Sequence, residues 1–391
     1  MSFFSGFSFW IALIVLLIPS IVLGVKEKSQ KYYLLFVSLL FVFLIYSKHI
    51  SSLGALLLFT LYEFSVIGCF VKFRKSENKI ISKLSVYVIL SLIPLVVNRL
   101  IPFVLKDTRW GFLGISYITF KVIQILVEIN DNMIEKISFI DYISFMLFFP
   151  TISSGPIDRS RRFLKDIYDV KTKNDYLENL GQGFEYILQG VFYKLILSQV
   201  IFDKMALVSG RYKPVHLIIY MYLYGFYLFF DFAGYSLMAV GTSKIFGINT
   251  PMNFNKPFIA KDMKDFWNRW HISLSHWFRD FVFNRLVFKM FKDKIFKSSL
   301  VVAMTAYIVD MVLMGIWHGI SLSYLLYGIY HGILLALTEY FQKTKFYKKH
   351  KSKKSFKYIS IFVTFNLVMF GFFIFSGKFI EVMEIIRRIL F

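Results

Sequence analysis

Long apolar runs recur along the chain and alternate with short polar stretches. The clearest runs cover residues 8–25, 32–47, 53–71, 301–317, 322–337 and 358–377. Each approaches the roughly 20 residues that a helix needs to cross the apolar core of a bilayer. When the runs broken by polar residues are counted as well, the pattern predicts an all-α polytopic membrane protein with about eleven transmembrane helices. We expect the run at 8–25 to be a retained helix, because it lacks the basic start and small-residue cleavage site of a signal peptide.

Two segments depart from this pattern. Residues 138–157 begin apolar but end in a Pro, Ser and Gly cluster followed by basic residues, which predicts a re-entrant segment shielded by protein. Residues 246–266 are polar and rich in turn-forming residues, and the stretch WNRWHISLSHWFRDFVFNRLVF follows at 267–288. We expect this second stretch to be one amphipathic helix that lies at the membrane interface or lines a partly wet cavity.

A continuous helix over 267–288 would separate its side chains by character. One side would be apolar and carry Trp270, Leu274, Trp277 and Phe281. A second side would be polar and carry Asn268, Ser275 and Arg279, with His271 beside them. The third side would carry Arg269, His276 and Asp280, whose opposite charges predict an ionic network.

The formal net charge of +22 comes from clusters between the apolar runs. These clusters lie at 26–31, 72–79, 158–173 and 342–357, and the positive-inside rule places them in the cytoplasm. The N-terminus and the tail after residue 377 would then lie outside the cell. Topology signals that touch anionic lipid explain this charge best, and docking of an acidic soluble protein is the main alternative.

Several ionisable residues interrupt the apolar runs, where charge is energetically expensive. They are Glu63, Arg99, Lys121, Asp231 and Asp310. We expect most of them to pair with one another or with helix ends. A transporter or flippase that uses Asp231, Asp310 and Arg99 remains a rival hypothesis, although the chain shows no internal repeat of the kind that many transporters have.

His318 is the most informative of the seven histidines. It ends an apolar run between Gly315 and Gly319, beside Trp317, and imidazole can accept and donate a proton near neutral pH. It is therefore a candidate general base, the alternative being a satisfied core histidine. His331 shares a helix face with Tyr324 and Tyr327, which predicts a hydrogen-bonded packing role. We expect His49, His216 and His350 to be solvated.

Other chemistries lack support in the sequence. Cys69 is the only cysteine, which excludes internal disulfides and cysteine-based metal sites. His271 and His276 are five residues apart and point to different sides of a helix, so we expect no metal site. The chain also lacks a glycine-rich phosphate-binding loop and a GxSxG elbow.

Several blocks together resemble the membrane-bound O-acyltransferase family. WNRWHISLSHWFRDF is followed, 47 residues after His271, by His318 in LMGIWHGISLSYLLYGIYHG. The blocks LGISYITFKVIQ (113–124), FFPTISSGPIDR (148–159), FYLFFDFAGYSLMAVG (226–241) and MNFNKPFIAKDMKDFW (252–267) extend the resemblance to about two-thirds of the chain. Within the family, the blocks are most similar to the branch that attaches D-alanine to teichoic acids.

The resemblance implies a fold in which a ring of helices surrounds a thin central partition, with a funnel opening on each face of the membrane. We expect one domain over 1–391, with peripheral helices at 1–106, a core with the site at 107–341, a basic loop at 342–357, and a last helix and tail at 358–391.

The resemblance also implies a reaction and its residues. His318 matches the family's catalytic histidine, and His271 matches a second position that is histidine in this branch and often asparagine in eukaryotic members. We expect substrate contacts from the neighbouring polar and aromatic residues Trp267, Asn268, Arg269, Ser275 and Trp317.

No resident cofactor is expected, because the acyl group would arrive as a thioester on the 4′-phosphopantetheine arm of a D-alanyl carrier protein, DltC. Further expected partners are DltD, a small membrane peptide of the DltX type and the teichoic acid pathway; nucleic acid is not expected. Alginate and peptidoglycan O-acetyltransferases share the WHG histidine, so acetyl transfer to an exported polysaccharide is the alternative.

Overall fold

The computed structural model describes residues 4, 6–47, 49–78, 80, 82–104, 112 and 114–390. These residues form helices and one isolated β-bridge, with no strand among them, so the all-α fold class is confirmed. The chain divides into two compact units. Unit 1 comprises Met1–Val191 and Tyr235–Pro251, and unit 2 comprises Phe192–Gly234 and Met252–Phe391. The expected boundary at residues 106 and 107 lies outside the described residues.

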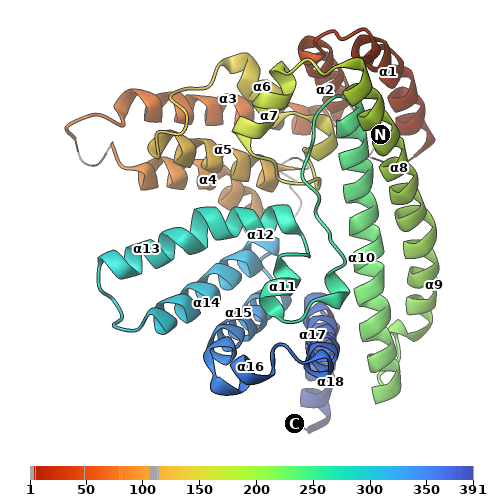
Figure 1. Ribbon diagram of the computed structural model, residues 1–391, viewed down its shortest axis with the longest axis vertical. Helices are drawn as coiled ribbons and strands as arrows, with labels where there is room; N and C mark the ends of the chain where they lie inside the picture. Colours follow the sequence, from red (N-terminus) through yellow and green to blue (C-terminus); the bar gives the residue numbers. More distant parts are fainter. Residues whose placement is uncertain are drawn as a thin grey trace. The chain divides into compact units, whose positions relative to one another are not determined.

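Unit 1 holds the first eight α-helices (Figure 1). They are α1 (Phe7–Val25), α2 (Lys31–Tyr46), α3 (Ile50–Phe73), α4 (Leu84–Val104), α5 (Ile115–Asn130), α6 (Phe139–Met146), α7 (Ser160–Tyr168) and α8 (Lys173–Val191), with the 3₁₀ turn η1 (Phe149–Thr151). The end of α10 (Pro214–Ile245) also belongs to this unit.

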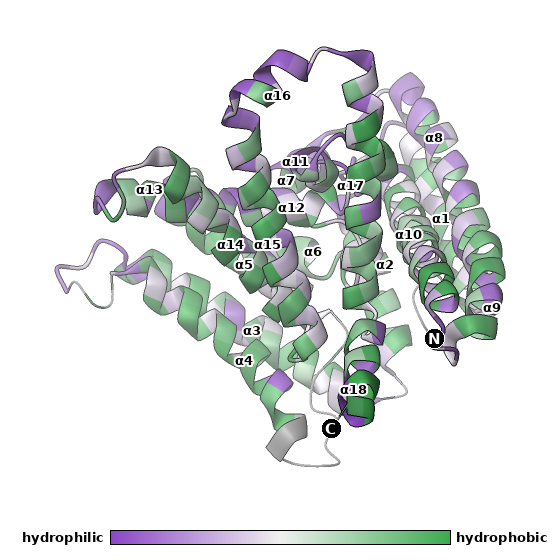
Figure 2. Cartoon of the chain, turned by 90° about the horizontal axis from the view of Figure 1, so that it is seen from below, coloured by the Kyte–Doolittle hydropathy of each residue, from purple (hydrophilic) through white to green (hydrophobic). Residues whose placement is uncertain are grey.

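Unit 2 holds the start of α10 and the remaining helices. They are η2 (Phe192–Leu197), α9 (Ser198–Ser209), η3 (Pro257–Ile259), α11 (Met263–Trp267), α12 (Ile272–Phe278), η4 (Arg279–Phe283), α13 (Asn284–Lys292), α14 (Ser299–His318), α15 (Leu322–Lys343), α16 (Lys345–His350), α17 (Lys354–Phe375) and α18 (Lys378–Leu390). Hydrophilic residues gather on α16, whereas α14 and α17 are mostly hydrophobic (Figure 2).

Each of the six clear apolar runs forms a helix, as predicted. Among the described residues, six helices are long and apolar enough to cross a membrane: α1, α3, α4, α10, α14 and α17. Helix α2 is apolar but shorter. The chain is therefore a multi-pass membrane protein, and the total of about eleven spans stays a prediction.

Residues 138–157 turn where the Pro, Ser and Gly cluster predicted it. Helix α6 ends at Met146, and the turn η1 follows with Phe149 and Ile152 fully buried. The buried Lys121 on α5 donates a hydrogen bond to the carbonyl oxygen of Phe145, 2.8 Å away. This bond satisfies a carbonyl at the helix end, which is the role expected for an ionisable residue in an apolar run.

Asp231 is likewise paired. Its carboxylate accepts a hydrogen bond from the ammonium of Lys194 within unit 2. An intramembrane charge neutralised in this way has a structural role, which weakens its use in the rival transporter hypothesis.

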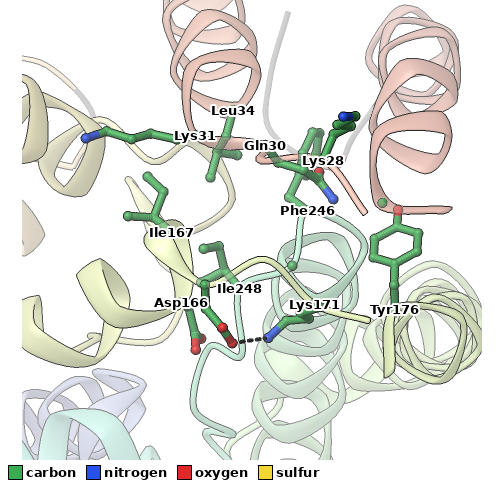
Figure 3. A pocket seen from close by; sticks show the side chains of 13 residues that line it. Lys28, Gln30, Lys31, Leu34, Asp166, Ile167, Lys171, Tyr176, Phe246 and Ile248 are labelled. Atoms are coloured by element: carbon green, nitrogen blue, oxygen red, sulfur yellow. Dashed lines mark ion pairs between the residues drawn. The ribbon is translucent and has the colours of Figure 1, made fainter. Parts of the chain in front are cut away.

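Unit 1 contains a polar cavity where two of the basic clusters meet (Figure 3). Lys28 and Lys31 come from the cluster at 26–31, and Lys171 comes from the cluster at 158–173. Lys31 pairs with Asp141 at 3.0 Å, and Lys171 lies 3.8 Å from Asp169. The two clusters therefore lie together, as loops on the same side of a membrane would.

Helices α14 and α15 pack with their backbones in close approach (Figure 1). A Cβ added at Gly328 of α15 would lie 2.4 Å from the carbonyl oxygen of Met311, and one added at Gly315 of α14 would lie 2.4 Å from that of Tyr324. Small residues at such positions are how membrane helices approach closely. Gly315 therefore lets α14 pack closely against α15, in addition to lying in an apolar run.

We expect Gly328→Ala to lower the free energy of unfolding by about 1–3 kcal/mol, because the methyl group must push α14 and α15 apart. Thermal unfolding in detergent measures the effect. Gly54→Ala on α3 is the matched control, since a Cβ there meets no atom within 4 Å. Equal melting temperatures for the two variants would contradict the close packing.

Candidate active site

His271 interrupts the segment that was predicted as one helix. Helix α11 ends at Trp267 and α12 begins at Ile272, and His271 between them has φ 45° and ψ 50°. A second change of helical geometry follows at η4, a π-helical turn over Arg279–Phe283. The prediction of an uninterrupted helix over 267–288 is therefore wrong, and so is the arrangement of sides derived from it.

The loop before α11 explains the break. Its Phe254 forms a β-bridge with Trp270, and the amide of Ile272 donates to the carbonyl of Asn253 at 2.9 Å. The hydroxyl of Ser273 donates to Oδ1 of Asn253 at 2.6 Å. A left-handed residue other than glycine costs roughly 1–2 kcal/mol. These contacts hold His271 in that conformation, and such strain is typical of functional sites.

Sequence reasoning did not identify Asn253 as a site residue. The signal was present in MNFNKPF, where asparagine and proline gather before an apolar stretch, as they do in turns. That pattern indicates a loop, but it does not tell which backbone groups the loop will bind.

The His271 side chain is buried, with 4% of its surface exposed, and packs edge-on against Phe232 with 4.7 Å between ring centres. Its Nε2 atom is buried and has no hydrogen-bond partner among the described residues. Burial, with a smaller contribution from the nearby His318, lowers the pKa of His271 well below 6.5. The imidazole is therefore neutral at physiological pH, and one nitrogen remains available to a ligand.

His318 is the last residue of α14 and is half-buried. Its ring centre lies 4.7 Å from that of Trp317, 5.1 Å from Phe375 of α17, and 6.0 and 6.2 Å from Tyr324 and Tyr327 of α15. Aromatic rings from three helices thus surround an imidazole that is still partly accessible. Tyr327 also links His318 to the segment that holds His271, because its ring centre lies 6.5 Å from that of Trp267.

A cavity of about 230 Å³ lies beside this segment, and neither His271 nor His318 is part of its lining. One wall is a face of α14 with Tyr307, Asp310, Met311 and Met314, and the same face reaches His318 one turn later. The facing residues include Trp267, Asn268 and Ser275, which come just before and after His271. Three of the predicted substrate contacts therefore line this cavity.

Arg269 does not line this cavity. Its Nε donates to the carboxylate of Asp265 at 2.6 Å, and its Nη1 donates to the carbonyl of Asn255 at 3.3 Å. The expected network of Arg269, His276 and Asp280 is therefore wrong for Arg269, while Asp280 pairs with Arg279 at 3.1 Å. The break is the reason, because it leaves Arg269 in the turn between α11 and α12, whereas His276 and Asp280 lie on the helical segment that follows.

His331 is a packing residue, as predicted, but it is not hydrogen-bonded. It is fully buried, and its ring centre lies 4.5 Å from that of Tyr327. Neither ring nitrogen has a hydrogen-bond partner among the described residues. Within the same part of the chain, no group of three histidine, cysteine or acidic residues could hold a metal ion.

The edge of the cavity is charged. Lys264 forms an ion pair with Glu339, which also lies 3.1 Å from Lys343. Burial raises the pKa of Glu339, but hydrogen bonds from Lys264 and Lys343 outweigh burial, and the pKa falls below its ordinary value. Glu339 is therefore ionised at neutral pH and pairs with Lys264 at the edge of the cavity and with Lys343 on its own helix.

Comparison with known proteins adds an independent line of evidence. Residues 40–380 match the model of MBOAT, the membrane-bound O-acyltransferase family. The chain is 42% identical to a teichoic acid D-alanyltransferase of Bacillus subtilis (strain 168), over 96% of this chain and 98% of the relative. It is 39% identical to a teichoic acid D-alanyltransferase of Lacticaseibacillus rhamnosus, over 94% of this chain and 95% of the relative. A probable alginate O-acetylase AlgI of Pseudomonas fluorescens is 28% identical, over 71% of this chain but 53% of the relative.

Proposed function

Because the chain belongs to the membrane-bound O-acyltransferase family, we propose that it transfers D-alanine across the membrane for the D-alanylation of teichoic acid. Acyl transfer itself follows from the family. The D-alanyl donor is supported by similarity to D-alanyltransferases along nearly their whole length, whereas the acetylase matches over about half of its own. In this proposal the chain acts as the DltB component of the pathway, in the bacterial plasma membrane.

Two observations carry the mechanism: His271 is buried with an unpartnered Nε2 among the described residues, and the half-buried His318 ends the face of α14 that lines the cavity. A thioester reacts with an alcohol once the alcohol is made nucleophilic. In the proposed step His318 takes the hydroxyl proton as the oxygen attacks the thioester carbonyl, and the carbon–sulfur bond then breaks. The proton passes from His318 to the leaving thiolate, so the products are an ester and a thiol.

His271 and Asn268 act on the carbonyl in this proposal. His271 is neutral and has an unpartnered Nε2, so it can donate a hydrogen bond to the oxygen that becomes negative. Asn268 is exposed to the cavity and can orient the thioester. The surrounding rings Trp267 and Trp317 exclude water, which would otherwise hydrolyse the donor.

The donor in this proposal is the phosphopantetheine thioester of the carrier protein DltC, with DltD and a DltX-like peptide as later partners. Two basic surfaces suit an acidic carrier. Helix α13 exposes Phe288 and Phe291 beside Lys289 and Lys292, and the segment 342–357 is rich in lysine. The positive-inside rule places both in the cytoplasm, with the N-terminus outside.

The proposed donor can be tested with proteoliposomes that contain the purified protein. Carrier protein loaded with labelled D-alanine is supplied on one side and an acceptor hydroxyl on the other, with acetyl-loaded carrier in parallel. We expect ester formation with D-alanine at least ten times faster than with acetate. A preference for acetate would support the polysaccharide O-acetyltransferase instead, and movement of label without a new ester bond would support a transporter.

A further inference from the structure

Asp310 is an intramembrane acidic residue for which the described residues supply no ion-pair partner. It lies on the membrane-spanning helix α14, its side chain is 7% exposed, and it lines the cavity near the histidines. Its Oδ1 atom is buried and has no hydrogen-bond partner among the described residues. An unsatisfied buried carboxylate lowers stability, so a functional role is the reason to retain it.

The position of Asp310 excludes direct contact with the reacting group. Eight residues separate it from His318 along one helix, which corresponds to about 12 Å. In a D-alanyl thioester, the ammonium nitrogen lies only about 2.5 Å from the carbonyl carbon, two covalent bonds away. A thioester that reacts at His318 therefore keeps its ammonium group far from Asp310.

The donor arm has a polar group at a matching distance. In a pantetheine thioester, eight covalent bonds separate the carbonyl carbon from the second amide nitrogen. At about 1.25 Å of advance per bond, an extended arm places this amide about 10 Å from the reacting carbon. The amide would then lie level with Asp310 while the thioester lies level with His318.

We propose that Asp310 is a positioning residue that accepts a hydrogen bond from the second amide N–H of the pantetheine arm; this inference rests on the proposed function. The lining between Asp310 and His318 fits the arm, because Met311 and Met314 offer apolar contact to its methylene groups. Asn268 and Ser275 offer hydrogen-bonding groups on the facing wall. The unpartnered Oδ1 of Asp310 can accept the hydrogen bond from this amide.

The test compares two donors, D-alanyl-pantetheine and D-alanyl-N-acetylcysteamine, which keeps only the first amide. We expect Asp310→Leu to raise the KM for D-alanyl-pantetheine about ten-fold and to change kcat little, because one hydrogen bond to the arm is lost. The KM for the N-acetylcysteamine donor should not change. Asp310→Asn keeps an acceptor oxygen and should restore part of the effect.

Asp231→Asn is the matched control, because this second intramembrane carboxylate is already paired with Lys194 and is absent from the cavity lining. Its KM values should equal those of the wild type. Asp310→Leu should also keep the wild-type melting temperature or exceed it, since it removes a buried polar group whose Oδ1 has no partner among the described residues.

Two results would overturn the inference. One is an equal rise in KM for both donors in Asp310→Leu. The other is that Asp310→Leu no longer raises the KM when the donor is propionyl-pantetheine, which lacks the ammonium group, because Asp310 would then recognise that group. Calorimetric binding of free pantetheine to the wild type and Asp310→Leu is a readout without transfer, and equal affinities would also refute the inference. Failure of the wild type to transfer D-alanine from any donor would refute the proposed function, while the binding comparison still tests Asp310.

Discussion

His318→Ala is expected to lower the rate of D-alanyl transfer by about 10²–10⁴, the range over which a general base accelerates a reaction. The reason is that His318 is partly accessible and ends the α14 face that lines the cavity. Transfer of labelled D-alanine from loaded carrier in proteoliposomes measures the effect. Carrier binding should be unchanged, because His318 lies away from the basic surfaces.

His49→Ala is the control for the same histidine-to-alanine change, since His49 is exposed in unit 1. It should transfer D-alanine at the wild-type rate. If His318→Ala keeps more than about a tenth of the wild-type rate while it remains folded, the assignment of His318 as general base is wrong.

The membrane helices were predictable because their cause is local. A run such as 301–317 must satisfy its backbone internally when it enters lipid, and only a helix does so within one segment. The observed α14, Ser299–His318, differs from that run by no more than two residues at either end. His318 also kept its predicted place at the end of the run, since Gly319 and the turn after it stop the helix.

The break at His271 was not predictable in the same way, because its cause is distant in sequence. A helical projection assumes that each residue follows the same rotation, and bonds from Asn253 and Phe254 override this between α11 and α12. Arg269 shows the consequence: its predicted partners lay beyond the break, and it binds Asp265 instead. The unpartnered oxygen of Asp310 also required coordinates, since the sequence predicted that such charges would mostly find partners.

His271→Gly is expected to lower the rate of transfer by about 10²–10³, the usual effect of removing one donor from an oxyanion site. Glycine is the informative replacement because His271 has φ 45°, which glycine adopts without strain. His271→Ala should lose as much activity. Its free energy of unfolding should also be about 1–2 kcal/mol lower than that of His271→Gly, because alanine in the left-handed conformation is strained and glycine is not. His271→Asn keeps a side-chain donor and tolerates this backbone conformation, so we expect it to stay within about ten-fold of the wild type.

The same variants test the neutral state of His271. Because its folded-state pKa lies below 6.5, the unfolded chain binds this proton more readily. The stability contributed by the neutral ring is complete above pH 6.5 and is lost as the pH falls below it, at up to about 1.4 kcal/mol per pH unit. The melting temperature of the wild type should therefore fall more than that of His271→Asn between about pH 7.5 and pH 5.5. Parallel curves would mean that the folded-state pKa of His271 is not lowered, and the assignment of a ring kept neutral by burial would then be wrong.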